Sequence, residues 1–433
     1  MSFHLTRRSM AALVSGGLVF SLAVGAQAET LRESITALLE SHQRIAAARA
    51  DVAAADESAT VATKAFRPTL DVTAHYGYEE QRKDNAANTN MPTREFDLKV
   101  TQKLFDFGST ELAEEQAKLA VDQAKVILDA TEQGLILEAV SAHIGLISAN
   151  EILNFAKGSE ANIKRQTELE DARVQRGSGF STDVLQAKAQ LAGAQARRVQ
   201  AEGALKQAVY RYQAVFGTMP ENITGLKKPR VPLDLLPPDM EAAVDLALKN
   251  SKQLEVTQIV SDIARISTKK SRADGLYPVF NLIGENKLKE DNGGTIGFKG
   301  EQIVKVEATY SFNLWGASLN TIEASKQAYL ASESRVQDAR TVISEQVRAA
   351  WQQLETSREN AQFLRNQANI ASEFLELARK ERRLGRRSLI DVLAGETALI
   401  NASSDAAAAE TSIATAAFTL LGVMGNLGVD AVQ

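Results

Sequence analysis

The stretch 177–181, Gly-Ser-Gly-Phe-Ser, contains the residue types that could most readily do chemistry. A glycine-rich loop can cradle phosphate through backbone N–H groups, and a serine beside a base can act as a nucleophile. Neither chemistry is supported, because no strand pattern precedes the stretch and no lysine follows it at the required spacing. The four histidines are scattered along the chain, at His4, His42, His75 and His143. We therefore expect no catalysis, no cofactor and no metal site, and we interpret His75 and His143 as surface or packing residues.

The first 28 residues have the organisation of a secretory signal. Arg7 and Arg8 precede an apolar run over 10–24, and a small-x-small site ends at Ala28, so we expect cleavage between Ala28 and Glu29. The paired arginines also resemble a twin-arginine signal. The general secretory route carries unfolded chains, which suits the membrane strands described below, so we favour that route. The signal predicts a bacterial envelope protein.

The composition of the remaining chain excludes several classes of protein. No run approaches the roughly 20 apolar residues of a membrane-spanning helix, so any membrane contact is expected through strands. There is no cysteine, which excludes disulfides and thiolate metal sites. Without the signal, 47 basic side chains face 54 acidic ones, a formal charge of minus seven, so nucleic acid is a poor candidate partner. Stability must come from packing and assembly.

Proline placement divides the chain into two halves. Five of the eight prolines crowd the segment 218–239, which we expect to be a linker. This linker separates a first structural repeat over 29–217 from a second over 240–425, and a C-terminal tail follows over 426–433.

The two halves repeat each other at a fixed spacing, which is the mark of an internal duplication. Landmarks of the first half recur 208 positions later: Gly108 as Gly316, Gly177 as Gly385, Asp183-Val184-Leu185 as Asp391-Val392-Leu393, and Gly217 as Gly425. Pro68 and Pro278 differ by 210 positions. The only length difference must therefore lie between the proline and the glycine of each half.

Apolar and polar residues alternate in two segments of each half, as at Leu70, Val72 and Tyr76. Runs near 10 residues with one apolar and one polar face are what a membrane barrel strand requires. A soluble, half-buried sheet is the alternative, and an interfacial girdle explains the strand aromatics better than a ligand platform does. We expect strands at about 69–80, 94–107, 279–288, which alternates poorly, and 303–315, with extracellular hairpin loops at 81–93 and 290–302.

After each strand pair the pattern becomes helical. The segments 109–176 and 317–384 contain no proline, and each would span roughly 100 Å as a continuous helix. Each ends at a glycine turn, from which a second helix returns with small apolar residues at three-four spacing, a coiled-coil seam. The sequence therefore predicts long antiparallel helical hairpins over 109–217 and 317–425, with their tips at the glycine turns.

Four strands cannot close a membrane barrel, because the smallest barrels have about eight strands and an open edge in lipid leaves backbone groups unpaired. The chain is therefore expected to form a ring. A dimer would give eight strands around a filled interior, whereas a trimer would give twelve strands around a pore. The mostly polar second face of the strands favours the larger, wet interior.

The repeated motif Gly-x-x-x-x-x-Asp-Val-Leu, at 177–185 and 385–393, resembles the TolC family of outer-membrane efflux and secretion ducts. The resemblance covers about 29–425, and Arg67-Pro68 before the first strand is more similar to members that serve type I secretion. It implies a mainly α fold with membrane β: a homotrimer with a 12-stranded β-barrel on an α-helical barrel. The expected location is the bacterial outer membrane, with the helical tunnel in the periplasm.

The resemblance also implies partners and sites. Members are recruited by a periplasmic adaptor joined to an inner-membrane pump, here an ABC or RND transporter, and the barrel contacts outer-membrane lipid. The docking residues are then those of the hairpin tips: Gly177, Ser178, Gly179, Phe180, Leu384, Gly385, Arg386, Arg387 and Ser388. Asp183 and Arg387 stand at gate positions, and Asp391 stands at the first of two constricting acids, where a ring of carboxylates would favour cations.

Two positions depart from the gate of the family: Ala394 stands where the family has a second acid, and Arg382 stands where it has an aromatic residue. Asp183 and Asp391 also fit a structural role, because Ser388-Leu-Ile-Asp391 matches a helix capping box. A stand-alone porin and a periplasmic coiled-coil structural protein are the alternative functions. The cargo, whether protein or small molecule, is not encoded in any motif that we can identify.

Overall fold

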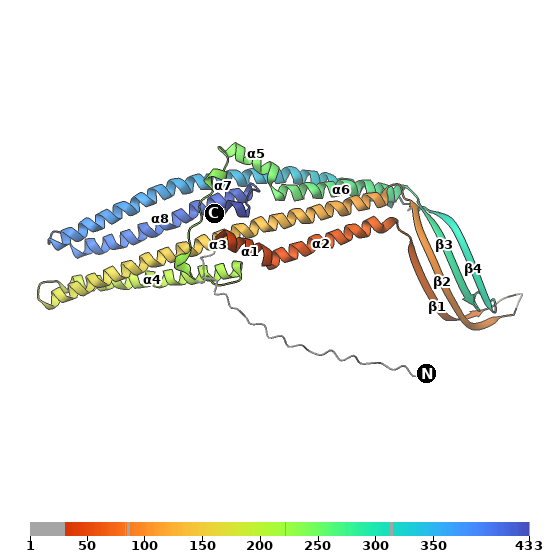
Figure 1. Cartoon of the computed structure of the whole chain (residues 1–433), viewed down its shortest axis with the longest axis horizontal. Coiled ribbons are helices and arrows are strands. Elements are labelled where there is room, and N and C mark those ends of the chain that lie inside the picture. Colours follow the sequence, from red (N-terminus) through yellow and green to blue (C-terminus); the bar gives the residue numbers. More distant parts are fainter. Residues whose placement is uncertain (1–30, 83, 85–86, 221, 312–314, 433) are drawn as a thin grey trace, which may run out of the picture.

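The computed structural model describes residues 31–82, 84, 87–220, 222–311 and 315–432, and in this part the chain is a long rod of helices with a sheet at one end (Figure 1). The predicted signal and the cleavage site between Ala28 and Glu29 lie outside the described residues. The main elements are α1 (Leu31–Ser41), α2 (Gln43–Thr63), β1 (Thr69–Gln81), β2 (Thr89–Phe105), α3 (Ser109–Gln175), α4 (Ser181–Phe216), α5 (Met240–Asn250), α6 (Lys252–Leu276), β3 (Val279–Glu290), β4 (Phe298–Thr309), α7 (Ala317–Arg383) and α8 (Leu389–Val423).

The strand hairpins show the duplication in their hydrogen-bond register. In the first hairpin Thr69 lies opposite Thr101, and in the second Val279 lies opposite Thr309. Adding 210 to each β1 residue number and 208 to each β2 residue number converts the pairs of the first hairpin into the pairs of the second. The agreement extends to the last pair of the second hairpin, Glu290 with Phe298. The two-residue difference between the repeats therefore falls in the loops that join the strands, and the pairing itself is unchanged.

The four strands form one antiparallel sheet in the order β1-β2-β3-β4. The register places even-numbered residues on one face, which includes Leu98 and Val306, and odd-numbered residues on the other. It also explains why β3 alternates poorly in the sequence. Leu282 and Leu288 join the apolar face, but Asn286 and Gly284 lie between them.

The odd-numbered face carries an ordered set of charges. Lysines of one strand lie opposite acids of the next: Glu95 opposite Lys289, Asp97 opposite Lys287 and Lys99 opposite Glu285. Lys289 Nζ lies 3.3 Å from a Glu95 oxygen and 3.8 Å from an oxygen of Glu301 on β4. Opposite charges in directly facing positions stabilise a sheet. On this face the positive charges of the lysines therefore neutralise the negative charges of the acids that they face.

Both ends of β2 and of β4 differ from those predicted, because backbone pairing rather than side-chain alternation decides where a strand ends. β4 spans 298–309 instead of 303–315, since its partner β3 begins at Val279, opposite Thr309. The predicted strand residues 312–314 lie outside the described residues. β2 starts at Thr89 instead of residue 94, which shortens the first loop, and it ends at Phe105 because Phe107 has a positive φ of 54°.

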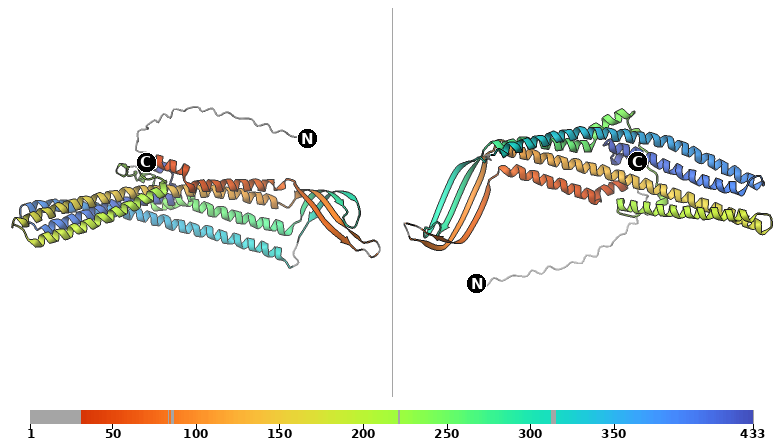
Figure 2. Two further views of the ribbon diagram at one scale, coloured as in Figure 1. Left: turned by 90° about the horizontal axis from the view of Figure 1, so that it is seen from below. Right: turned by 180° about the vertical axis from the view of Figure 1, so that it is seen from behind.

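The long helices run the whole length of the rod (Figure 2). α3 and α7 each have 67 residues, α2 and α6 pack along the halves nearer the sheet, and α4 and α8 pack along the distal halves (Figure 1). α3 and α8 each contain a window long and apolar enough to cross a membrane, which the sequence analysis did not anticipate. About half of each window, 56% and 44%, is buried within the protein, as in the core helices of a bundle.

The largest core lies midway along the rod. Ile35 of α1, Leu135 of α3, Val347 of α7 and Phe418 of α8 meet there in one buried cluster. The segment 426–433, which we predicted to be a tail, contributes to the same cluster, because Val432 is fully buried in it. The apolar residues of this segment therefore fold back onto the core.

Candidate functional site

The two hairpin tips are built by the same backbone motif. At the first tip, Ser178 N donates to Arg173 O at 3.0 Å and Gly177 N donates to Val174 O at 2.9 Å. This is a Schellman cap, in which the residue after the helix adopts a left-handed conformation that favours glycine. Gly177 and Gly385 both have φ of 74°, and the second tip repeats the bonds from Arg386 N to Glu381 O and from Gly385 N to Arg382 O.

Both tips offer open backbone and exposed apolar side chains. A Cβ atom placed on Gly177 or Gly385 would meet nothing within 4 Å. Beside them, Phe180 is 75% exposed and Leu384 is 71% exposed. Large apolar side chains at the end of a rod, next to accessible backbone, form a surface suited to protein contact.

Arg387 and Asp183, the two residues expected at the gate, do not meet within one chain. Arg387 Nε lies 3.0 Å from Glu381 Oε2, and its guanidinium lies over the Phe374 ring, 5.0 Å from the centroid. Both partners belong to its own hairpin. Asp183 lies in the first turn of α4, where its backbone N donates to Phe180 O at 3.1 Å.

Asp391 is exposed in the first turn of α8. Its backbone N donates to the Ser388 hydroxyl at 3.2 Å, so Ser388 is the N-cap of this helix. This is one half of the capping box that the sequence suggested. The Asp391 carboxylate itself remains at the surface, one turn before the exposed Ala394.

The ion pair that joins the two hairpins involves a residue that sequence reasoning missed. Glu170 of α3 is only 3% exposed, and its Oε1 accepts from Arg382 Nη2 of α7 at 2.6 Å. In the described part of the chain, this is the one ion pair between α3 or α4 and α7 or α8. A signal existed, since Glu170 continues the buried three-four stripe of Ile163 and Thr167, where a charge needs a partner.

Arg382 also contacts the second tip directly. Its Nη1 donates to the carbonyl oxygen of Arg387 at 3.2 Å, while Arg173 Nη1 shares Glu170 from the first hairpin at 3.1 Å. One guanidinium thus connects the turn after α7 with the buried carboxylate of α3.

A second polar region lies where the linker crosses the long helices. Lys228 of the linker lies 2.8 Å from Glu151 of α3 and 3.3 Å from Glu410 of α8, and Arg365 of α7 also pairs with Glu410. The bond from Arg365 lowers the pKa of Glu410 although burial opposes it. Burial acts to lower the pKa of Lys228, but Glu151 and Glu410 together raise it. The side chains of this cluster are therefore charged, and their ion pairs hold the linker against α3 and α8.

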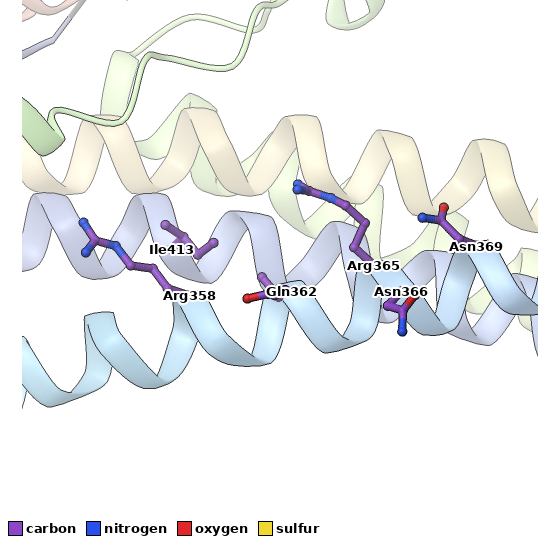
Figure 3. A pocket seen from close by; sticks show the side chains of 7 residues that line it. Arg358, Gln362, Arg365, Asn366, Asn369 and Ile413 are labelled. Atoms are coloured by element: carbon purple, nitrogen blue, oxygen red, sulfur yellow. The ribbon is translucent and has the colours of Figure 1, made fainter.

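An open groove of about 390 Å³ adjoins this cluster, and Figure 3 shows Arg358, Gln362 and Arg365 along α7 with Ile413 on α8. Its walls are mostly exposed polar side chains of α7, together with Ala361 and with Ile413 of the antiparallel α8. No group of three or more His, Cys, Asp or Glu side chains suited to a metal occurs among the described residues.

An open sheet with one apolar face, fused to two helical hairpins with exposed tips, defines a subunit of an outer-membrane channel that extends into the periplasm. The chain belongs to the family described as "Outer membrane efflux protein", whose model matches residues 34–218 and 243–426. The two matched segments follow the two structural repeats.

Characterised relatives match over most of the chain. The outer membrane efflux protein BepC of Brucella suis is 25% identical over 421 residues, 97% of this chain and 90% of that protein. The outer membrane protein TolC of Escherichia coli is 23% identical, over 93% and 83% of the two chains. The alkaline protease secretion protein AprF of Pseudomonas aeruginosa is 24% identical, over 74% and 67%. The resemblance to the TolC family is confirmed.

A solved structure shows the same fold. The outer-membrane channel OprN superimposes with a TM-score of 0.79 at 18% identity, over 92% of this chain and 90% of that one. The chain therefore has the fold of such channels, a helical tunnel joined to a β-barrel, as the sequence predicted. The family is one of outer-membrane efflux channels.

Proposed function

We propose that three copies of the chain form an exit duct, and that a periplasmic adaptor joins its hairpin tips to an inner-membrane ABC or RND transporter. One observation carries this proposal: a single chain is incomplete at both of its edges. The sheet has unpaired edges at β1 and β4, and the row of long helices ends at α4 and α7.

The sheet supports a ring in lipid. On its apolar face Val304 is 81% exposed and Tyr76 is 73% exposed, which suits contact with outer-membrane lipid. Backbone groups on an open edge would each cost several kcal/mol in that environment. Three copies supply twelve strands, which close the edges and leave the charged face around water.

The helices support the same ring, because α4 has a second apolar seam that its own hairpin leaves exposed. Its positions follow heptad spacing: Leu185, Ala189, Ala192, Ala196, Val199 and Gly203. The equivalent positions of α8 are buried or half-buried where α8 packs on α3: Leu393, Thr397, Ile400, Ser404, Ala407 and Thr411. We infer that α4 packs on α7 of a neighbouring copy, which offers large exposed side chains at Phe363, Ile370 and Leu377.

We propose the tips as the adaptor-docking site, formed by Gly177, Ser178, Gly179, Phe180, Leu384, Gly385, Arg386, Arg387 and Ser388. Phe180 and Leu384 would provide the apolar anchors of the contact. The open glycines would allow the backbone of the adaptor to approach. An adaptor bound here would continue the tunnel toward the inner membrane.

We propose that two kinds of link close the tip. Within a chain, Arg382 holds the second hairpin to Glu170 of the first. Between chains, Asp183 on the α4 edge would face Arg387 of the neighbouring copy, which is why the two do not meet in one chain. Three exposed Asp391 carboxylates would line the narrow end and favour cations.

The cargo is proposed to depend on the pump and adaptor, since a common duct makes few specific contacts. The names of the relatives support this, because BepC is called an efflux protein and AprF is named for the secretion of a protease.

The experiment crosslinks the tips in cells from Gly177→Cys or Gly385→Cys, in a chain with no other cysteine. Adaptor and pump should be recovered, and the protein should sediment with the outer membrane. Gly217→Cys is the control, since Gly217 has the same backbone conformation at the far end of α4. Crosslinking that is equal at Gly217 would contradict tip docking, recovery without any pump would favour a porin, and absence from the membrane would favour a periplasmic structural protein.

A further inference from the structure

The two edge strands of the sheet carry the information needed to predict how neighbouring copies join. We propose that β4 of one copy pairs antiparallel with β1 of the next, with Tyr78 opposite Val304, Tyr76 opposite Val306 and His75 opposite Glu307. This inference rests on the proposed ring and adds the residue-level register of its interface.

The register follows from the internal duplication. Inside one chain, β2, the second strand of the first repeat, pairs with β3, the first strand of the second repeat. In the ring, β4 of one copy would meet β1 of the next. These strands correspond to β2 and β3, because β4 is the second strand of its repeat and β1 is the first strand of its repeat. The offsets of 208 and 210 that relate the two hairpins should therefore convert the β2–β3 ladder into the ladder between copies.

Three pairs of the β2–β3 ladder illustrate the conversion: Phe96 with Leu288 becomes Val304 with Tyr78, Leu98 with Asn286 becomes Val306 with Tyr76, and Lys99 with Glu285 becomes Glu307 with His75. The ladder extends from Thr73 opposite Thr309 to Glu80 opposite Gln302, within the bounds of both strands.

The chemistry of the facing side chains agrees with this register. Aromatic and β-branched residues meet on the lipid face, where Tyr76, Tyr78, Val304 and Val306 are between 64% and 81% exposed in a single chain. On the polar face an imidazole meets a carboxylate at His75 and Glu307. Each of these side chains lacks a cross-strand neighbour on the open side of its strand and gains one in the ring.

Registers shifted by one or two residues would place less compatible side chains opposite each other. A slip of one residue would turn the apolar face of one strand toward the wet side. A slip of two residues in one direction would place Glu79 opposite Glu301, two like charges. A slip of two in the other direction would place Glu80 opposite Val304, a carboxylate against an apolar residue on the lipid face.

Paired cysteines test the register directly, since the protein has none of its own. One variant carries Tyr78→Cys with Val304→Cys, and another carries His75→Cys with Glu307→Cys. Directly facing residues alternate between two kinds of pair with Cα atoms about 4.5 and 5.5 Å apart, and both separations permit a disulfide. The two variants sample one pair of each kind. The control, Tyr78→Cys with Ala308→Cys, is displaced by four residues, about 13 Å along the strand.

After mild oxidation in outer-membrane vesicles, both facing variants should shift from single chains to covalent trimers on a denaturing gel, and a reductant should reverse the shift. The control and each single-cysteine variant should stay as single chains. Crosslinking of the displaced pair, or no crosslinking by either facing pair in a protein that native gels show to be trimeric, would overturn the register. A wild-type protein that forms no ring in the membrane would instead overturn the proposed function.

Discussion

Lys188 on α4 and Glu396 on α8 occupy equivalent positions of the two repeats and carry opposite charges. Each pairs with the helix before it, Lys188 with Asp171 at 3.7 Å and Glu396 with Arg379, and these partners are also equivalent to each other. The two hairpins thus have an ion pair at the same position, with the basic and the acidic residue exchanged between the helices. The environments differ, because the Lys188 pair is exposed whereas Glu396 is only 2% exposed.

This difference predicts unequal effects of the same mutation. Arg379→Ala would leave the buried Glu396 carboxylate without its partner and should lower the free energy of unfolding by about 3 kcal/mol. Asp171→Ala removes the equivalent exposed pair and should cost less than about 1 kcal/mol. Thermal unfolding of the detergent-solubilised protein, followed by circular dichroism, measures both. Equal losses would show that burial of Glu396 does not strengthen its pair.

Gly425 should be far less replaceable than its repeat equivalent Gly217. Both have positive φ, 73° and 76°, so alanine strains each by about 1 kcal/mol. A Cβ on Gly425 would also lie 2.3 Å from the carbonyl oxygen of Asn250, whereas a Cβ on Gly217 meets nothing within 4 Å. We expect Gly425→Ala to lower the melting temperature clearly more than Gly217→Ala. Similar melting temperatures would mean that the junction between α5 and α6 yields freely.

A bulky side chain at the second tip should stop export without disturbing assembly. Gly385→Trp places an indole where the adaptor is proposed to approach, in space that is open in the isolated chain. Export should be lost while trimers remain on native gels. The matched control is Gly316→Trp, because Gly316 has the same backbone conformation and open surroundings at the other end of α7. Unchanged export by the Gly385 variant would refute the docking assignment.

Arg382→Ala should open the tip. The variant loses the link from α7 to Glu170 and the bond to the Arg387 carbonyl, so large antibiotics should enter cells more readily and channel conductance in planar bilayers should rise. The exchange Glu170→Arg with Arg382→Glu should recover part of the closure, as a double-mutant cycle can show. Asp171→Asn, which removes a pair within one hairpin, should not change conductance. Conductance unaffected by Arg382→Ala would exclude the link as a closing element.

His143 should make the protein less stable in mild acid. Burial lowers the pKa of His143, although the hydrogen bond to the Lys227 carbonyl at 2.9 Å opposes the shift. The unfolded chain binds a proton near pH 6.5, so the contribution of His143 to stability is complete above that pH and is lost as the pH falls toward the lower folded-state pKa. His143→Gln should therefore lose less thermal stability than the wild type between pH 7.5 and 5. An identical loss in both proteins would contradict a neutral His143.

The fold was predictable because the hydrophobic periodicity of its strands and helices is clear and occurs in two copies. Alternation located β1, β2 and β4, whereas β3 alternates poorly, and the absence of proline located α3 and α7. The strand ends were not predictable, since they depend on which partner residue is opposite, as Thr309 opposite Val279 shows. The packing of Val432 into the central core has no local signal either, because it depends on helices far away in the sequence.

The positions of the hairpin tips were predictable, but their side-chain interactions were predictable only in part. The glycine turns revealed the tips, and Ser388 was correctly identified as a cap. The partner of Arg382 was not found, because the stripe that contains Glu170 becomes buried only when the second hairpin lies against the first. The proposed contact of Asp183 with Arg387 would involve a neighbouring copy, which no single-chain pattern can place.

The facing acids and lysines of the sheet have a consequence for whatever leaves the cell. Because Glu95, Asp97 and Lys99 are matched in turn by Lys289, Lys287 and Glu285, their fields largely cancel within a few ångströms of the wall. If this face lines the proposed pore, a polypeptide or solute in transit would meet a wetted surface to which neither its positive nor its negative groups adhere. The barrel end of the duct would then let solutes pass without selecting or retaining them by charge.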